Sequence, residues 1–467
     1  MGVLLSKILE KLPVEDATDY RSQNKILFQQ LNKTSIVIDD DPTGNQTVYN
    51  VPLLTTWDVN ALITEFKKET PIFFLLTNSR SLTVQKSSEI YNEIAKNITE
   101  ASKQTGRDFS VISRSDSTLR GHFPSEINAI KQESSFQNSI TVFIPVMFEG
   151  GRVTVNNIHY LLENENLIPV NETPFAQDHS FGYSKANLKE WIEEKSSGKV
   201  KACEVFSISI EEIRNLNVTI LVEKILNIHF GKILIFNALN YDDLDKVANV
   251  LLLAEKRGKQ IIYRTSSSFV PSYIGLNPKS LLSASQLIGN DCKTGGLTIV
   301  GSYVPKSSSQ LKKALDYFKN EAVFEIDVEA LFNKNSIEYL ENLATKISEV
   351  LEIGEDVLVF TSRKLITGKT IVENLNIGEI VSNALVQIVR KLKVKPKYLI
   401  AKGGITSHDL AIKGLDMKRS KVIGQILPGI PVWEMGIETK FPDLSYIVFP
   451  GNVGDEKSLL TIIQKLT

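Results

Sequence analysis

The chain has 467 residues, more than one ordinary hydrophobic core holds, so two domains, or at most three, are expected. Hydrophobic residues make up 42% and charged residues 23%, as in globular proteins that form cores without disulfides. With 53 basic and 54 acidic residues, the net charge of −1 gives no electrostatic reason for a nucleic acid or an anionic membrane as partner. A small molecule is therefore the expected partner.

Cysteine and histidine give no sign of a disulfide framework or of a metal site. The two cysteines, Cys203 and Cys292, lie far apart in the sequence, and the five histidines lack the spacing of metal ligands. So few cysteines fit a reducing cytoplasm, which is the expected location. No apolar run reaches the length of a membrane span, and the N-terminus has no secretory cleavage pattern.

The first stretch of the chain, MGVLLSKILEKL, allows two interpretations. It matches the N-myristoylation pattern M-G-x-x-x-[ST], a short pattern that many chains match by chance. Its apolar residues also follow helical spacing, which places Val3, Leu4, Ile8 and Leu12 on one side. An amphipathic helix is therefore expected here.

Short apolar runs alternate with longer helical patterns through most of the first half. Strands are expected at 35–38, 72–76, 109–112, 140–144, 232–236 and 260–264, with helices such as 84–104 and 241–258 between them. This alternation predicts a parallel sheet covered on both faces. Residues 146–216 interrupt it with GG, PV, TPF and FGYS phrases, which predict a long insertion of loops and short elements.

Glycine and polar residues gather at GNDCKTGG (289–296), where we place the domain boundary. It gives an N-terminal domain of residues 1–290 and a C-terminal domain of 291–467. A second alternating series follows, with strands expected at 297–301, 323–326, 357–360, 398–401, 422–427 and 446–449, and a clear helix at 377–393. The predicted fold class is α/β, with two domains that each contain a largely parallel sheet flanked by helices.

Four loops of the first half directly follow predicted strands and are rich in charged and hydroxyl groups. They are DDDPTG, TNSR, SRSDSTLRG and RTSSS. In open parallel sheets, ligands bind outside the carboxyl ends of the strands, so these loops should share one edge. Their charged residues are Asp39, Asp40, Asp41, Arg80, Arg114, Asp116, Arg120 and Arg264, and Ser117 is among their hydroxyls.

These residue types suit a polyhydroxylated acid. An arginine fork binds a carboxylate or a phosphate bidentately, so Arg114 and Arg264 are candidate substrate contacts beside the other arginines. Aspartates accept hydrogen bonds from sugar hydroxyls, and one of them can take a proton from an attacking hydroxyl. The alternative is that the aspartates and arginines pair with each other as structural salt bridges and caps.

Glycine-containing loops follow strands of the second half. They are GSYVPKSSS (301–309), KGGITSHDLA (402–411), LPGIPVWEMG (427–436), which contains Gly429, and FPGNVGD (449–455). Glycines let backbone N–H groups approach a ligand, and helix N-termini favour phosphates, so these loops predict a bound nucleotide. The alternative is ordinary turn glycine.

Two known nucleotide motifs are absent. The phrase ending in GKT at 368–370 resembles a Walker A loop, but Arg363 stands where the first glycine is required. Residues 371–376 also read as a loop before the next helix, whereas a Walker A lysine lies at the start of its helix. No G-x-G-x-x-G follows any predicted strand.

The order of these phrases carries a resemblance to a known family. DDDPTG, TNSR, SRSDSTLRG, IPVMFEGGRVTVNNIHYL, TPFAQDHSFGYSKANLKEWIEEK, GSYVPK, AKGGITSHDLA, LPGIPVW and FPGNVGD occur in this sequence. Together they resemble the four-carbon acid sugar kinase family, from about residue 35 to the C-terminus. Two phrases depart from many members: DDDPTGNQ stands for ADDFTGA, and GGIT stands for GGET. The exact substrate therefore stays open.

The resemblance implies a substrate domain followed by a nucleotide domain, with the active site in the cleft between them. Members use ATP to phosphorylate a hydroxyl of small sugar acids such as threonate, erythronate or 3-oxo-tetronates. By position, Asp40, Asp41, Arg80, Asp116 and Arg120 would belong to the sugar-acid site. The implied ATP contacts are Ser302, Gly403, Gly404, Ile405, Thr406 and Gly451.

A mechanism follows as a hypothesis. Phosphoryl transfer needs positioning and charge neutralisation, which Mg²⁺ bridging the phosphates would supply, with Lys402 as a candidate helper. Arg120 or Arg80 would hold the carboxylate of the acid. Asp40 would orient the attacking hydroxyl, with Asp116 as the alternative. Domain closure would exclude water.

Other functions remain open from the sequence alone. One is a non-catalytic sugar-acid sensor, and another is a kinase for a branched or oxidised pentonate. A third is an interaction scaffold that uses the insertion at 146–216. The sequence does not decide the phosphorylated hydroxyl, regulation, or whether the chain forms a homo-oligomer.

Overall fold

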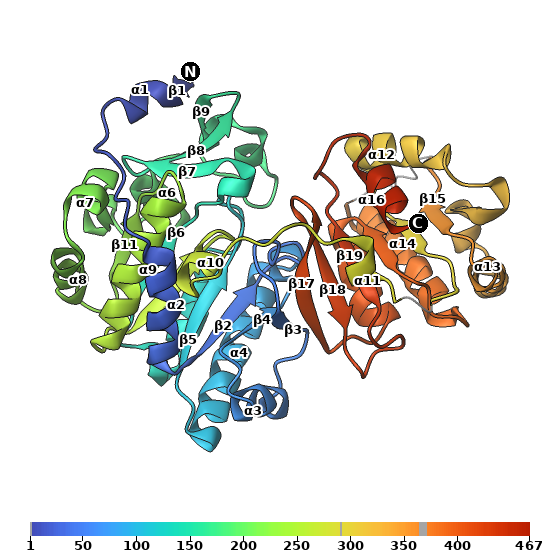
Figure 1. The fold of residues 1–467 in the computed structure, drawn as a ribbon, viewed down its shortest axis with the longest axis horizontal. Coiled ribbons are helices and arrows are strands. Elements are labelled where there is room, and N and C mark those ends of the chain that lie inside the picture. Colours follow the sequence, from blue (N-terminus) through green and yellow to red (C-terminus); the bar gives the residue numbers. More distant parts are fainter. Residues whose placement is uncertain (1, 290–291, 364–370) are drawn as a thin grey trace. The chain divides into compact units, whose positions relative to one another are not determined.

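The computed structural model describes residues 2–289, 292–363 and 371–467, and only the backbone of 371–376. Its contacts divide the chain into two compact units (Figure 1). The first unit comprises Met1–Thr47 and Thr56–Pro278, and the second comprises Val48–Thr55 and Lys279–Thr467. Residues 290 and 291, where the sequence places the boundary, lie outside the described residues, so that boundary stays a prediction.

A parallel sheet forms the centre of the first unit, in the strand order β10-β11-β6-β12-β5-β2-β4. Every strand predicted for this half is present. β2 and β4 are buried along their whole length, which explains the apolar centre of β2 and the unbroken apolar sequence of β4. The bounds are β2 Thr34–Asp39, β4 Ile72–Leu76, β5 Phe109–Arg114, β6 Ile140–Ile144, β10 Phe206–Ile208, β11 Ile233–Phe236 and β12 Ile261–Thr265.

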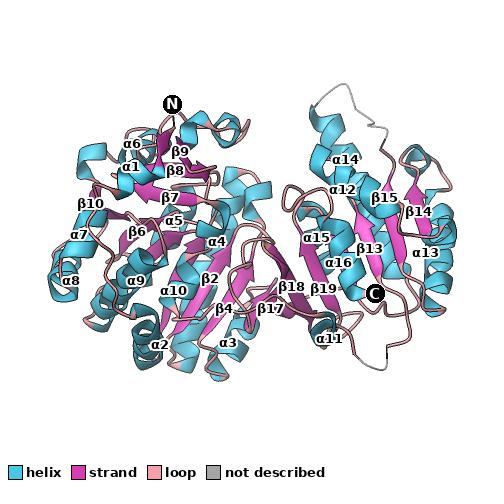
Figure 2. Cartoon of the chain, turned by 45° about the horizontal axis from the view of Figure 1, so that its top comes forward, coloured by secondary structure: helices cyan, strands magenta, loops and turns pink. Residues whose placement is uncertain are grey.

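Helices of the first unit pack in two groups, α2, α8, α9 and α10 in one and α3, α4 and α5 in the other (Figure 2). The long helix α4 begins where the Thr83 hydroxyl accepts the N–H of Lys86, and it ends at Gly106, whose φ is 70°. The bounds are α2 Tyr20–Leu31, α3 Val59–Lys67, α4 Val84–Thr105, α5 Ser125–Lys131, α6 Leu188–Lys195, α7 Ile210–Asn215, α8 Val218–Leu226, α9 Tyr241–Lys256 and α10 Phe269–Tyr273.

The predicted insertion folds as part of the first unit. Three of its strands form a small antiparallel sheet with β1 from the N-terminus, in the order β1-β9-β8-β7. The strands of this sheet are β1 Val3–Leu4, β7 Arg152–Val155, β8 Ile158–Glu163 and β9 Asn166–Pro169. The predicted N-terminal helix is therefore wrong for Val3 and Leu4, which pair with β9 and satisfy its edge. The helix α1 is only Leu5–Leu9, and Ile8 and Leu12 pack against the core of the small sheet.

A mixed sheet forms the centre of the second unit, in the order β3-β17-β18-β19-β16-β13-β15-β14. The strands from β19 to β14 are parallel, as predicted. The stretch 427–436 was expected to be a loop; it instead forms a hairpin in which β18 pairs with β17 and β19 in antiparallel fashion. The bounds are β3 Val51–Leu54, β13 Leu297–Val300, β14 Val323–Ile326, β15 Val357–Thr361, β16 Leu399–Lys402, β17 Arg419–Leu427, β18 Ile430–Met435 and β19 Ser445–Phe449.

The helices of the second unit pack on this sheet around a core that includes Val300, Ile400, Ile447 and Phe449. The expected loop at 371–376 is wrong, because α14 begins at Ile371; the GKT phrase lies outside the described residues. No described helix is long and apolar enough to cross a membrane. The bounds are α11 Ala284–Leu287, α12 Pro305–Leu315, α13 Ser336–Glu352, α14 Ile371–Lys391, α15 Gly404–Asp409 and α16 Ser458–Leu466.

Candidate active site

The carboxyl ends of β4, β2, β5 and β12 lie side by side in the first unit. Asp39, the last residue of β2, is in register with both Leu76 of β4 and Arg114 of β5. Arg114 is in turn in register with Thr265, the last residue of β12. The four polar loops selected from the sequence therefore leave the sheet next to one another.

Arg114 is the centre of a buried ion-pair network. Its Nη1 lies 3.0 Å from Asp39 Oδ1 and 3.3 Å from Asp40 Oδ1, and its Nη2 donates to Ser267 Oγ at 3.0 Å. The second oxygen of Asp40 accepts a hydrogen bond from Ser115 Oγ at 2.6 Å. Burial raises the pKa of Asp39 to about 7, with Arg114 opposing the shift and the charge of Asp40 adding to it.

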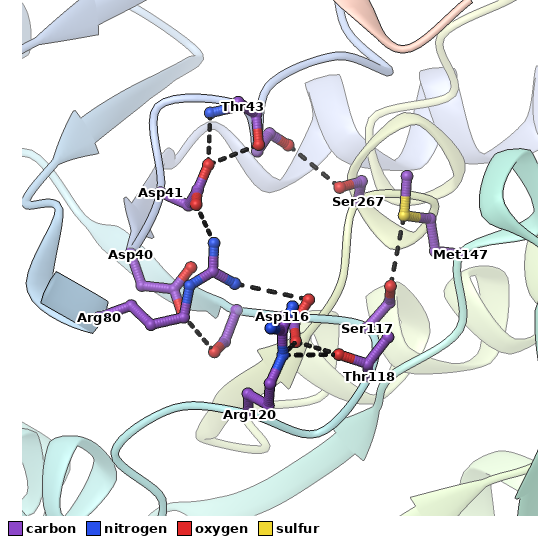
Figure 3. A network of polar contacts seen from close by, with 12 residues as sticks. Asp40, Asp41, Thr43, Arg80, Asp116, Ser117, Thr118, Arg120, Met147 and Ser267 are labelled. Carbon is purple, nitrogen blue, oxygen red and sulfur yellow. Dashed lines mark hydrogen bonds and ion pairs between the residues drawn. The ribbon is translucent and has the colours of Figure 1, made fainter. Parts of the chain in front are cut away.

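A second chain of charges lies nearer the surface (Figure 3). Asp41 accepts from the backbone N–H of Thr43 at 2.7 Å and from the guanidinium of Arg80. Arg80 Nη1 lies 3.4 Å from Asp116 Oδ1, and Arg120 Nε donates to Asp116 Oδ2 at 2.8 Å. The side chains of Arg80 and Arg120 are 19% and 28% exposed, so a ligand can reach this layer.

The two arginines determine the charge state of Asp116. Burial alone would raise the pKa of this carboxyl, but Arg80, Arg120 and the hydroxyl of Thr118 outweigh burial and hold it well below its usual range. Asp116 is therefore an ionised anchor for two guanidinium groups. A carboxylate with so low a pKa is a weak proton acceptor.

Arg264, a candidate substrate contact from the sequence, is buried beside Glu126, which the sequence did not predict. Its Nη1 is 3.9 Å from Glu126 Oε2, and Glu126 Oε1 accepts from the hydroxyls of Ser79 and Ser87 at 2.9 and 3.0 Å. A side chain at Gly121 would approach Arg264 Nη2 to 3.1 Å, so a residue without Cβ is needed here. Glu126 lies within α5, not in a strand-end loop, which is why the strand-end rule missed it.

The insertion holds the loop after β5 from outside. His159 Nε2 lies 2.7 Å from the carbonyl oxygen of Ser117, which can only accept, so this nitrogen carries the proton. The hydroxyl of Tyr183 donates to the carbonyl of Thr118 at 2.7 Å. Burial lowers the pKa of His159 to about 4, so the imidazole is neutral near pH 7.

Side chains of the insertion also reach the charged residues and hydroxyls of this loop. Ser117 Oγ donates to Met147 Sδ at 3.4 Å (Figure 3). Asp178 Oδ2 lies 3.6 Å from Arg120 Nη1, and the ring of Phe175 lies under the Arg120 guanidinium, 5.1 Å from centroid to Cζ. The insertion therefore completes the first unit's site.

Polar loops also meet at one edge of the second unit, at the ends of β13, β16 and β19. Ser307 Oγ donates to Ser302 Oγ at 2.9 Å and lies 3.1 Å from the carbonyl oxygen of Gly451. Gly403 has a φ of 121°, and an added Cβ would lie 3.0 Å from Ser302 Cβ. Lys402 donates to the carbonyl of Pro450 at 2.6 Å and is buried.

The other predicted nucleotide contacts differ in their surroundings. Thr406 is buried against Gly301, whereas Ile405 is 64% exposed. Gly404 begins α15 with open space around it. Gly429 lies in the β17–β18 turn, and its N–H donates to the Gln425 side chain at 2.6 Å. That N–H is therefore already engaged within the turn.

Arg363 is a further polar group at this edge that the strand-end rule could have found, because it follows β15. Its Nη1 donates to the carbonyl of Ser302 at 2.7 Å. Its Nε and Nη2 are buried and have no hydrogen-bond partner among the described residues. Two donors thus remain for an acceptor beside Ser302.

No group of three or more His, Cys, Asp or Glu side chains in the described residues is arranged to hold a metal ion. This does not conflict with Mg²⁺ as a companion of a nucleotide, because protein sites usually give Mg²⁺ one or two carboxylates and leave the other positions to phosphates and water.

Comparisons with known proteins agree with a charged candidate sugar-acid site in the first unit and a candidate nucleotide site in the second. Residues 35–273 match the family model described as a sugar-binding N-terminal domain, and residues 297–459 match the one described as a nucleotide-binding C-terminal domain. No curated protein matches the chain.

Two solved structures share the fold. Haemophilus influenzae protein HI1011, of the family DUF1537, is 16% identical, with a TM-score of 0.62 over 92% of this chain and 99% of that one. A proposed tRNA synthase from Salmonella typhimurium LT2 is also 16% identical, with a TM-score of 0.67 over 91% and 98%. A sugar-binding domain followed by a nucleotide-binding domain, both matched by family models, shows that the chain belongs to the four-carbon acid sugar kinase family.

Proposed function

We propose that this chain is an ATP-dependent kinase that phosphorylates a hydroxyl of a small sugar acid of the threonate, erythronate or 3-oxo-tetronate type. One observation carries the proposal. The sugar-binding domain places alternating carboxylates and guanidinium groups at a partly exposed edge, and a nucleotide-binding domain follows in the same chain. A polyhydroxylated anion needs both kinds of group.

In the sugar-acid site, the outer charge layer would contact the substrate. Asp41 and Asp116 pair with Arg80 and Arg120, as the salt-bridge alternative predicted, but these pairs also fix the direction of each guanidinium. A carboxylate of the substrate would take the remaining N–H donors of Arg80 or Arg120. The carboxylates would accept hydrogen bonds from the sugar hydroxyls.

Asp40 remains our proposal for the group that orients the attacking hydroxyl. Its carboxylate is buried and engaged by Ser115 and Arg114. The role therefore requires that the substrate hydroxyl replace Ser115 as the donor to Asp40. Asp116 is the less suitable candidate, because its two arginines lower its pKa.

The nucleotide would bind at the loops after β13, β16 and β19, beside Arg363. The close approach of Gly403 and Gly451 to Ser302 leaves no side chain between these backbones, and Arg363 offers two unpartnered donors there. These groups fit a phosphate chain. ATP, with Mg²⁺, supplies the phosphoryl group, and the residues named here would bind and orient it.

A non-catalytic sugar-acid sensor is the second candidate, since the engagement of Asp40 within the protein is also what a binding protein would show. A coupled assay of ADP release with ATP, Mg²⁺ and a panel of four- to six-carbon aldonates separates the two. We expect ADP release with at least one acid and none with the corresponding alditols. Binding of an acid without ADP release would favour the sensor, and a preference for five-carbon acids would favour a pentonate kinase.

A further inference from the structure

Arg152, at the start of β7 in the insertion, differs from the other arginines of the site because no carboxylate of the described residues forms an ion pair with it. Its side chain is half-buried, and its Nε is buried without a hydrogen-bond partner among the described residues. The arginines that do face carboxylates are Arg80 with Asp41 and Asp116, Arg114 with Asp39 and Asp40, Arg120 with Asp116 and Asp178, and Arg264 with Glu126.

Arg152 is nevertheless placed beside the outer charge layer. The guanidinium groups of Arg152 and Arg120 both lie over the ring of Phe175, with Cζ 5.5 and 5.1 Å from its centroid. The backbone of Arg152 exchanges two hydrogen bonds with Met147, at 2.8 and 2.9 Å, and Met147 Sδ accepts from Ser117 Oγ. Arg152 is thus tied to the loop after β5 through both its backbone and its side chain.

Gly150 makes room for this guanidinium. A Cβ at Gly150 would overlap Arg152 Nη1 and approach its Cζ to 3.1 Å. The side chain therefore folds back over the tight turn before β7 and does not extend into solvent. A guanidinium cannot lose its proton in a protein, so this position is a fixed positive charge. The charges of Asp116 and Glu163 favour it from a distance, although no carboxylate of the described residues forms an ion pair with it.

Leaving a half-buried charge without a partner costs free energy, which a bound anion would offset. We propose that Arg152 binds the carboxylate of the substrate, together with Arg120, and so selects an acid over the uncharged polyol; this rests on the proposed function. The phosphate of a nucleotide has related chemistry. Arg152, however, lies in the sugar-binding match, in the element that encloses the sugar-acid loop.

The test measures binding, not turnover, by calorimetry on the full-length protein. The ligands are L-threonate, D-erythronate, their alditols, inorganic phosphate and ATP. For Arg152→Gln we expect the aldonate to bind roughly ten- to a hundred-fold more weakly, the loss of a charge-assisted contact, with unchanged affinity for the alditol and ATP. Arg152→Lys should recover part of the loss, because it keeps the charge but not the fork.

Two further variants separate binding from structure. Gly150→Ala displaces the guanidinium without removing its charge and should also weaken the aldonate. Arg21→Gln removes a half-buried arginine that pairs with Asp245 at 2.8 Å and does not belong to the outer charge layer. It should lower stability without changing the aldonate-to-alditol ratio.

Three outcomes would overturn the proposal: no binding of any aldonate to the unmodified protein, equal losses for aldonate and alditol, or weaker binding of phosphate or ATP alone. If the aldonate binds as expected but no ADP is released, the kinase proposal fails and the role of Arg152 in carboxylate binding stands.

Discussion

Asp40→Asn changes the site at a fully buried carboxylate while keeping the shape of the side chain. The amide oxygen of Asn can still accept from Ser115, which lies 2.6 Å from Asp40 Oδ2. The substitution removes the charge that faces Arg114 at 3.3 Å. A charge-assisted hydrogen bond in a buried site contributes about 1.5–3 kcal/mol to stability.

Asp39 offsets part of this loss. Burial raises its pKa to about 7, and the charge of Asp40 contributes to the rise, so removal of that charge favours ionised Asp39 and its 3.0 Å contact with Arg114. We therefore expect Asp40→Asn to lower the free energy of unfolding by only about 1–2 kcal/mol at pH 7.

The pH dependence of the free energy of unfolding gives a second test of the coupling between Asp39 and Asp40. A folded-state pKa of about 7 for Asp39, against 3.8 in an unfolded chain, means that the native state keeps a proton which the unfolded state has lost. The contribution of protonated Asp39 to the free energy of unfolding is therefore fully present below pH 4 and is lost as the pH rises to 7. In Asp40→Asn, chemical denaturation should show a smaller decrease in the free energy of unfolding between pH 4 and pH 7.

Turnover should respond far more than stability. If Asp40 orients the attacking hydroxyl, ADP release should fall roughly 10²- to 10⁴-fold, with ATP binding unchanged. Asp245→Asn is the matched control, since it removes a buried carboxylate paired with Arg21 outside the site. Unchanged turnover in Asp40→Asn would remove this residue from the mechanism, and an equal loss in Asp245→Asn would attribute the effect to folding.

Three other predictions concern single side chains. Burial lowers the pKa of Lys402 to about 7, with the charge of Lys306 adding to the shift. Between pH 7 and 10 the unfolded state therefore binds more protons than the folded state, and the free energy of unfolding should rise with pH. Lys402→Met should flatten this rise, measured by chemical denaturation at several pH values. His159→Leu leaves the Ser117 carbonyl without its donor; we expect a stability loss of about 1–3 kcal/mol and a raised KM for the acid, and a KM equal to that of the unmodified protein would contradict the role of the insertion. Arg363→Gln should weaken ATP roughly ten-fold in calorimetry and leave aldonate binding unchanged, and the reverse pattern would exclude Arg363 from the nucleotide site.

The strands rich in apolar residues were predictable, because burial on both faces of a sheet favours that composition. The runs at 72–76 and 140–144 have the expected bounds. The hairpin strand β18 was missed because Gly429 and Pro431 resemble a loop, and a proline inside a strand argues against that assignment. Pairing partners outside the segment decide such cases, as they do for Val3 and Leu4.

The grouping of residues in the candidate site was predictable where the parallel-sheet rule applies and not elsewhere. The rule selected Asp40, Asp116 and Arg120 because they follow strand ends. It did not select Glu126, which lies within a helix, or Arg152, whose environment depends on Phe175 in the 3₁₀ helix Pro174–Gln177. Such contacts depend on tertiary packing that no local spacing records.

Direct detection of the product tests the central claim most closely. The full-length protein would be incubated with ATP, Mg²⁺ and each four- to six-carbon aldonate, and the acid analysed by mass spectrometry and ³¹P NMR. We predict a phosphate monoester of one sugar acid, formed in step with ADP and absent with Asp40→Asn. Intact ATP with every acid, or ADP formed with inorganic phosphate alone, would contradict the account.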